Sequence, residues 1–114
     1  MNCNAGDVVT VDFPGVTDIK RRPAIVLSST EYRAIRPDVI IGLVTSQTKR
    51  LGVTDYVLQD WQTAGLRTVS VFRSFIVTLP RSANLAVVGR LSARDWQGVT
   101  ACVRVALAET EGSI

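Results

Sequence analysis

The stretch DVIIGLVT, from Asp38 to Thr45, is a near-continuous run of β-branched and apolar residues interrupted by Gly42. A run of this kind is typical of a strand that is buried on both faces of a sheet. The stretch PAIVLSS, from Pro23 to Ser29, has the same character. Because a glycine inside a strand often marks a bulge or a bend, we expect Gly42 to lie where the sheet turns a corner. Two buried strands in the first half of the chain therefore indicate a β core.

Shorter strands are predicted on both sides of this pair. The run DVVTVDF, from Asp7 to Phe13, alternates, so that Val9 and Val11 face one side and Thr10 the other. Four further strands are predicted at Thr54 to Asp60, Thr68 to Phe72, Phe75 to Leu79 and Leu85 to Leu91. Many short strands in a chain of 114 residues favour a small, strongly bent barrel. The length fits a single domain that spans residues 1–114.

The end of the chain changes from strand to helix periodicity. Apolar residues recur at helical spacing from Trp96 to Val103, which predicts one amphipathic helix over residues 93–108. Ser92 followed by Asp95 resembles a capping box at its start. A shorter helical turn is predicted in STEYRAI, residues 29–35. The expected fold is thus mainly β, with a C-terminal α-helix that closes the barrel.

The composition restricts the chemistry of any site. The chain has no histidine, and its two cysteines, Cys3 and Cys102, stand alone, so zinc-finger spacing and an imidazole base are both excluded. We therefore predict no metal site and no cofactor. Of the 13 basic residues, 11 are arginine, whose planar donor fork suits phosphate oxygens. The net charge of +3 permits a polyanionic partner and equally fits an ordinary basic surface.

The apolar runs are too short for a membrane helix, which needs about 20 apolar residues. The first residues, MNCNAGDVV, lack a basic stretch followed by an apolar one, as a secretory signal requires. A cytoplasmic protein with no membrane partner is therefore expected.

Five segments stand in a fixed order along the chain: Gly6 to Phe13, Arg22 to Ser28, Leu43 to Gln47, Trp61 to Leu66 with Ser70-Val71 after it, and Gly89 to Ser92. Each one alone is a weak signal, but all five in this order resemble the MazF/PemK family of toxins. The resemblance covers nearly the whole chain. It implies an SH3-like β-barrel with appended helices, the toxin of a type II toxin–antitoxin system. It also implies a homodimer, a cognate antitoxin as partner, and cleavage of single-stranded RNA as the activity.

The resemblance implies Arg22 and Thr45 as the catalytic pair. Attack of a ribose 2′-hydroxyl on the adjacent phosphate needs in-line positioning and stabilisation of the charge that develops on the phosphate oxygens. A guanidinium beside a hydroxyl supplies that stabilisation. Arg22 precedes one predicted strand and Thr45 ends another, so antiparallel pairing would place both at the same rim. Arginine is a poor general base, and the base stays unassigned, with Asp12 and Asp18 the nearest carboxylates in sequence.

Other polar residues surround this pair in the sequence. We expect them to lie in neighbouring loops and to bind RNA through phosphates or base edges. They are Lys20, Arg21, Ser46, Gln47 and Lys49.

Two alternatives to the nuclease stay open. A CcdB-like gyrase poison shares the fold, but such chains depend on a Trp-Gly-Ile ending, whereas this chain ends Glu111-Gly112-Ser113-Ile114. A non-catalytic barrel that binds RNA or protein is the second. The loop from Pro14 to Arg21 also lacks the Ser-Glu-Gln stretch that often precedes Arg-Pro-Ala in the family. The target RNA sequence therefore does not transfer from the family.

With no histidine and no paired carboxylate cluster in the sequence, a catalytic divalent ion lacks its usual ligands. We expect the purified protein to cut long RNA in excess EDTA and to leave 2′,3′-cyclic phosphate ends. Gel analysis of the fragments, with and without chelator, tests this expectation. Activity that vanished in EDTA and returned with magnesium would contradict it.

Overall fold

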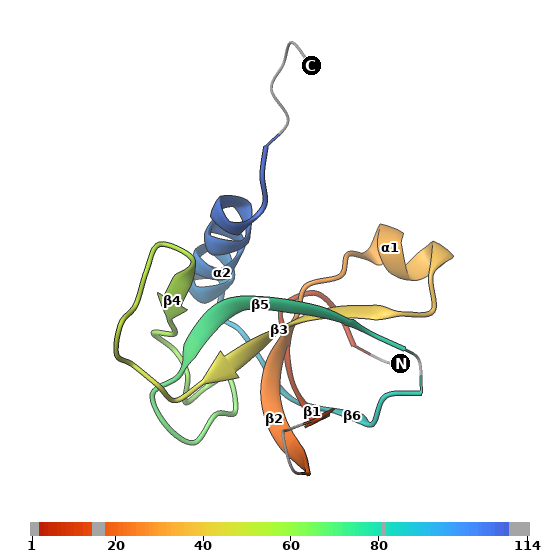
Figure 1. Ribbon diagram of the computed structural model, residues 1–114, viewed down its shortest axis with the longest axis horizontal. Coiled ribbons are helices and arrows are strands. Elements are labelled where there is room, and N and C mark those ends of the chain that lie inside the picture. Colours follow the sequence, from red (N-terminus) through yellow and green to blue (C-terminus); the bar gives the residue numbers. More distant parts are fainter. Residues whose placement is uncertain (1–2, 15–17, 81, 110–114) are drawn as a thin grey trace.

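Six strands form one antiparallel sheet in the order β4-β5-β3-β2-β1-β6 (Figure 1). The computed structural model describes residues 3–14, 18–80 and 82–109. The strands are β1 Asp7–Pro14, β2 Ile19–Val26, β3 Val39–Thr45, β4 Asp55–Val57, β5 Val71–Leu79 and β6 Leu85–Arg90. The helices are α1 Thr30–Ile35 and α2 Ala93–Ala106. The chain ending at residues 111–114, on which the gyrase-poison alternative was judged, lies outside the described residues.

The sheet is strongly curved but it is not a closed barrel. Its two outer strands, β4 and β6, stand at opposite ends of the strand order and do not pair with each other. The curvature brings Phe13 of β1 to Phe75 of β5, with ring centroids 5.8 Å apart in an edge-to-face contact, although β2 and β3 lie between those strands. The predicted mainly β fold with a C-terminal helix is confirmed, and the sheet stops short of closure.

The two central strands bury side chains on both faces, as their apolar runs predict. Ile25 of β2 belongs to one hydrophobic cluster, while its neighbours Ala24 and Val26 belong to the other. The first cluster includes Val99 and Cys102 of α2, so the helix covers that face of the sheet. The second contains Val9 and Val11 of β1 together with Val39 and Ile41 of β3. Each central strand therefore contributes to two cores.

The strand β2 begins earlier than its apolar pattern predicts. Its ladder with β1 continues through Val11↔Arg22 and Asp12↔Arg21 to Pro14↔Ile19. The expectation that residues 20–22 lie in a loop is therefore wrong. These residues are exposed, so this end of the strand has no buried side chain to give it a hydrophobic period.

The strands predicted at 68–72 and 75–79 are one strand, β5. The register between β3 and β5 shifts between Gly42 and Val44, and Arg73 and Ser74 fall within this irregularity, where they interrupt the apolar pattern. Gly42 lies at the shift, as predicted, and a Cβ there would collide with the ring of Phe72. In the sequence alone, an irregularity within one strand therefore has the pattern of a turn between two strands.

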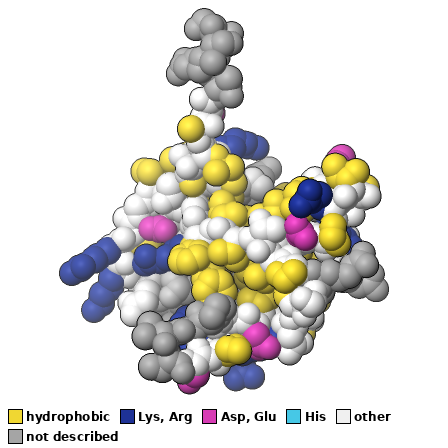
Figure 2. Space-filling model, turned by 45° about the vertical axis from the view of Figure 1, so that its right-hand side comes forward, with side chains coloured by type: hydrophobic (Ala, Val, Ile, Leu, Met, Phe, Trp, Pro, Cys, Tyr) yellow, Lys and Arg dark blue, Asp and Glu magenta, His cyan; other side chains and the backbone are white. Residues whose placement is uncertain are grey.

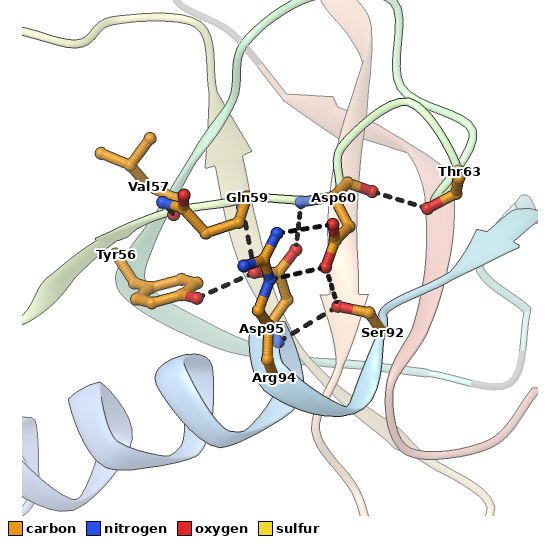
Figure 3. Close-up of polar contacts among 8 residues, drawn as sticks. All are labelled: Tyr56, Val57, Gln59, Asp60, Thr63, Ser92, Arg94 and Asp95. Carbon is orange, nitrogen blue, oxygen red and sulfur yellow. Dashed lines mark hydrogen bonds and ion pairs between the residues drawn. The ribbon is translucent and has the colours of Figure 1, made fainter.

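The first turn of α2 is joined to the segment after β4 by a buried carboxylate (Figure 3). Asp95 is fully buried and accepts hydrogen bonds from the Tyr56 hydroxyl (2.8 Å) and from the backbone N–H groups of Gln59 (3.0 Å) and Asp60 (2.8 Å). Ser92 caps the helix as predicted, because its Oγ accepts from the Asp95 N–H. The Asp95 side chain, however, holds the segment after β4. This explains why β4 ends at Val57 and not at Asp60.

A second carboxylate extends this network at the surface. Asp60 accepts two hydrogen bonds from the guanidinium of Arg94, at 2.9 and 3.0 Å, and one from the hydroxyl of Ser92 at 2.6 Å. These contacts, with Arg94 the stronger, lower the pKa of Asp60 to about 2. Burial and the neighbouring Asp95 raise the pKa of Tyr56 to about 12, so its hydroxyl stays a donor at neutral pH. Near pH 7 Asp60 is therefore an acceptor for Arg94 and Ser92, and Tyr56 is a donor to Asp95.

The substitution Asp95→Asn tests how much the hydrogen bonds accepted by the Asp95 side chain contribute to stability. An amide replaces one acceptor oxygen by an NH₂ group, which would face an O–H or N–H donor in a buried site. We expect a loss of about 2 to 4 kcal/mol in the free energy of unfolding, measured with urea. As a control, Asp38→Asn weakens only the 3.6 Å surface pair with Arg36 and should cost less than about 0.5 kcal/mol. Equal losses of unfolding free energy for the two substitutions would show that the hydrogen bonds of Asp95 do not stabilise the fold.

Candidate functional site

A groove of about 670 Å³ opens between the exposed half of β2 and the end of β3. Thr10 of β1 and Val88 of β6 contribute to its lining, and residues 65–68 with Ser70 form its remaining wall. Four of the predicted site residues line this groove: Arg21, Arg22, Thr45 and Ser46.

Arg22 and Thr45 meet at the groove because β2 and β3 are antiparallel. The ladder between β2 and β3 ends at the pair Ala24↔Leu43, and Arg22 and Thr45 lie just beyond this pair on their two strands. Arg22 is exposed, whereas Thr45 is half-buried at the last position of β3. The Oγ1 of Thr45 accepts a hydrogen bond from the Gln47 N–H at 3.2 Å. This bond leaves the Thr45 hydroxyl proton available for another acceptor.

A second hollow of about 550 Å³ shares Thr45 with the groove. It is lined by Thr45, Gln47, Lys49, Arg50 and Arg73. Arg73 of β5 donates from Nη2 to the backbone oxygen of Lys49 at 3.4 Å, and its buried Nε has no hydrogen-bond partner among the described residues. Thr45 therefore lies where the two hollows adjoin. Lys20 lines neither of them.

The charged residues that line these hollows are all cations. None of the described residues that line them is an aspartate or a glutamate. Elsewhere, arginines are matched with carboxylates: Arg90 with Asp7 and Arg94 with Asp60, each at 2.9 Å. The lining cations without an ion pair to a described residue are Arg22, Lys49, Arg50, Arg67 and Arg73. The protein therefore concentrates unneutralised positive charge at the two hollows.

Arg21 is the exception among the lining cations. Its Nη1 lies 3.0 Å from the Asp12 carboxylate and also donates to the backbone oxygen of Asn84, whose side-chain amide donates to Asp12. The hydrogen bonds from Arg21 and Asn84 lower the pKa of Asp12. Asp12 is therefore a weak base whose oxygens are already engaged. The other carboxylate considered from the sequence, Asp18, is exposed and lines neither hollow.

Two lining arginines, Arg67 and Arg73, were not singled out from the sequence. Each stands alone between uncharged residues, Arg67 before a predicted strand and Arg73 between two such strands. No local pattern distinguishes them from surface arginines. They line the hollows only because two segments pack beside the end of β3. These segments are residues 59–70, which we call loop 59–70, and strand β5.

Among residues 3–14, 18–80 and 82–109, no group of three or more His, Cys, Asp or Glu side chains is placed to hold a metal ion. Neither α1 nor α2 has the length and hydropathy of a membrane-crossing helix.

Known proteins share this architecture. The model of the family described as PemK-like, MazF-like toxin of type II toxin–antitoxin system matches residues 4–107. No curated protein sequence matches the chain. A chain of the MazE–MazF crystal structure from Deinococcus radiodurans superposes with a TM-score of 0.74 at 22% identity, covering 91% of this chain and 94% of that one.

Two further structures come from mycobacteria. An endoribonuclease in complex with its cognate antitoxin, from a mycobacterial species, gives a TM-score of 0.71 at 20% identity over 91% of this chain and 93% of that one. The Mycobacterium tuberculosis toxin MazF-mt6 gives 0.70 at 20% identity over 88% and 94%. At these identities the superpositions establish the common fold.

Proposed function

The chain belongs to the PemK-like, MazF-like family of toxins of type II toxin–antitoxin systems, and we propose that it is an endoribonuclease that cuts single-stranded RNA at the junction of Arg22 and Thr45. The observation that carries the proposal is the electrostatics of the groove. Arg22 faces no carboxylate there, and the adjoining hollow adds Lys49, Arg50 and Arg73. Among the described residues, every charged side chain that lines this surface is a cation, which favours the polyanionic RNA backbone as ligand.

The reaction needs no nucleophile from the protein. The ribose 2′-oxygen attacks the adjacent phosphorus, the bond from phosphorus to the 5′-oxygen breaks, and the products are a 2′,3′-cyclic phosphate and a 5′-hydroxyl. Negative charge grows on the non-bridging oxygens in between. Arg22 would meet this charge with its fork of donors, and the Thr45 hydroxyl would donate to one of the same oxygens. One proton leaves the 2′-oxygen and one is taken up by the leaving 5′-oxygen, so the step conserves protons. Neither proton transfer is assigned to a side chain.

The remaining polar residues would bind the strand on either side of the cut. Lys49, Arg50 and Arg73 would hold phosphates beyond Thr45, and Ser46 with Gln47 would contact base edges near the cut. Arg21 would contribute to RNA binding after exchanging its contact with Asp12, and Lys20, which lines neither hollow, would act through long-range attraction.

The partners proposed for the chain are a cognate antitoxin and a second copy of itself, in the cytoplasm where RNA is found. Structures with this fold include complexes with an antitoxin. An antitoxin with acidic side chains over Arg21 and Arg22 would block the groove. Large apolar side chains such as Phe75 and Val105 are more than half exposed, and Figure 2 shows hydrophobic side chains gathered in the middle of one face. Such a surface favours burial against a second copy.

A two-fold homodimer is the expected assembly, with at least about 1,000 Å² buried in total. Light scattering at micromolar concentration should return twice the chain mass of 12.4 kDa. A mass of one chain under these conditions would speak against the dimer.

Substitutions at the two central residues test the nuclease itself. Arg22→Ala should lower the single-turnover cleavage rate about 100-fold to 1,000-fold, the scale of a lost oxyanion donor. Arg22→Lys should restore little, because a point charge does not reproduce the fork. Thr45→Val keeps the shape and the strand propensity but removes the hydroxyl. It should lower the rate while urea unfolding stays close to that of the wild type.

Lys49→Ala is the matched control, since Lys49 lines only the adjoining hollow. It should weaken RNA binding and reduce its salt dependence, with little change in the rate at saturating RNA. If Arg22→Ala gave the same modest, salt-sensitive loss, Arg22 would be a phosphate contact only. The protein would then be an RNA-binding module and not a nuclease.

A further inference from the structure

The wall of the groove that faces β2 and β3 is built by residues 65–68, to which the sequence motifs assign no role. These residues belong to loop 59–70, which joins β4 to β5. A loop that carries a binding residue is effective when its backbone is held before the ligand arrives. The contacts along this loop show how firmly it is held.

The start and the end of the loop are tied to neighbouring elements. At the start, the N–H groups of Gln59 and Asp60 are bound by the buried carboxylate of Asp95 (Figure 3). At the end, the oxygen of Ser70 accepts from the Leu58 N–H at 2.9 Å, and the Ser70 Oγ donates to the oxygen of Thr68 at 2.8 Å. The loop is therefore closed at its base.

The middle of the loop is packed against β6 and the core. Gly65 has a φ of +89°, and a Cβ there would collide with the carbonyl of Val88, while a Cβ on Gly89 would collide with the carbonyl of Ala64. Such close backbone contact is open only to glycine. Ala64 is fully buried, and Leu66 donates its N–H to the Trp61 oxygen at 3.0 Å and packs against the first core.

Arg67 follows directly after these anchored residues. It lines the groove and is exposed, and it has no hydrogen bond or ion pair with any described residue. Its guanidinium is therefore unneutralised while its backbone is fixed. By contrast, the guanidinium of Arg94, in the first turn of α2, donates two hydrogen bonds to the Asp60 carboxylate.

From this arrangement we infer that Arg67 binds a backbone phosphate of the RNA that is not the one cut, and so fixes the strand across the groove from Arg22. The inference rests on the proposed function for the identity of the ligand. A phosphate is favoured over a base because no carboxylate of a described residue lines the groove beside Arg67, and a guanidinium without an ion-pair partner retains its full charge for a polyanion. Loop 59–70 supplies the preorganisation.

The test compares Arg67→Gln with Arg104→Gln, which removes an exposed charge from α2 that lines neither hollow. Binding of a 2′-O-methyl single-stranded RNA, which cannot be cut by 2′-attack, is measured as a function of KCl for several sequences. Arg67→Gln should weaken binding about fivefold to tenfold at low salt and reduce the slope of log K against log salt by about 0.7, the value for one phosphate of a single strand. The loss should be uniform across sequences. Arg67→Lys should keep most of the affinity, because one charge remains.

The outcomes separate this inference from the nuclease. An effect of Arg67→Gln no larger than that of Arg104→Gln, or a loss confined to particular sequences, would overturn the phosphate contact even if the wild type cuts RNA. A fall in the single-turnover rate at saturating RNA with unchanged affinity would also overturn it. Failure of the wild type to cut RNA would overturn only the proposed cleavage, because the uncut RNA still reports on Arg67.

Discussion

The buried carboxylate of Asp95 is the contact on which both the position of the C-terminal helix and the shape of the groove depend. It lies in the first turn of α2 and binds two successive N–H groups of the loop that becomes the far wall of the groove. A buried charge is costly unless its hydrogen-bonding capacity is met. Tyr56 provides the third donor, and its ring lies over Gly98, where a Cβ would collide with it. The helix, strand β4 and the loop are thereby fixed as one unit.

The distribution of arginines separates stabilising charges from those left for a ligand. Arg90 and Arg94 are each matched with a carboxylate near an end of a strand or helix, and Arg21 is matched with Asp12 beside the groove. In contrast, no carboxylate lines the hollows on either side of Thr45 among the described residues. Because like charges in one place repel each other, such a cluster opposes compactness and favours binding of a polyanion. This pattern fits a toxin whose antitoxin would supply the missing negative charge.

Thr45 lies at the boundary between the two hollows. It is the last residue of β3, it lines both hollows, and the Gln47 N–H occupies one of its acceptor positions. A hydroxyl held in this way donates in one preferred direction. Arg22, in contrast, is exposed and free of described partners, so in the proposed reaction its guanidinium would be able to adjust to the charge that develops on the phosphate.

The sequence alone determined those features whose signal is local. The apolar runs of β2 and β3 predicted two buried strands, and the helical period with Ser92 predicted α2 and its cap. The antiparallel arrangement of these strands also predicted that Arg22 and Thr45 lie at the same rim, and both residues line the groove. Only the tertiary structure decided that residues 20–22 extend a strand, because exposed residues carry no hydrophobic period. It also decided that the sheet stays open and that Arg67 and Arg73 reach the hollows. Their positions follow from the backbone packing of Gly65 against β6 and from the irregularity in β5, and such contacts between distant segments leave no periodic pattern in the chain.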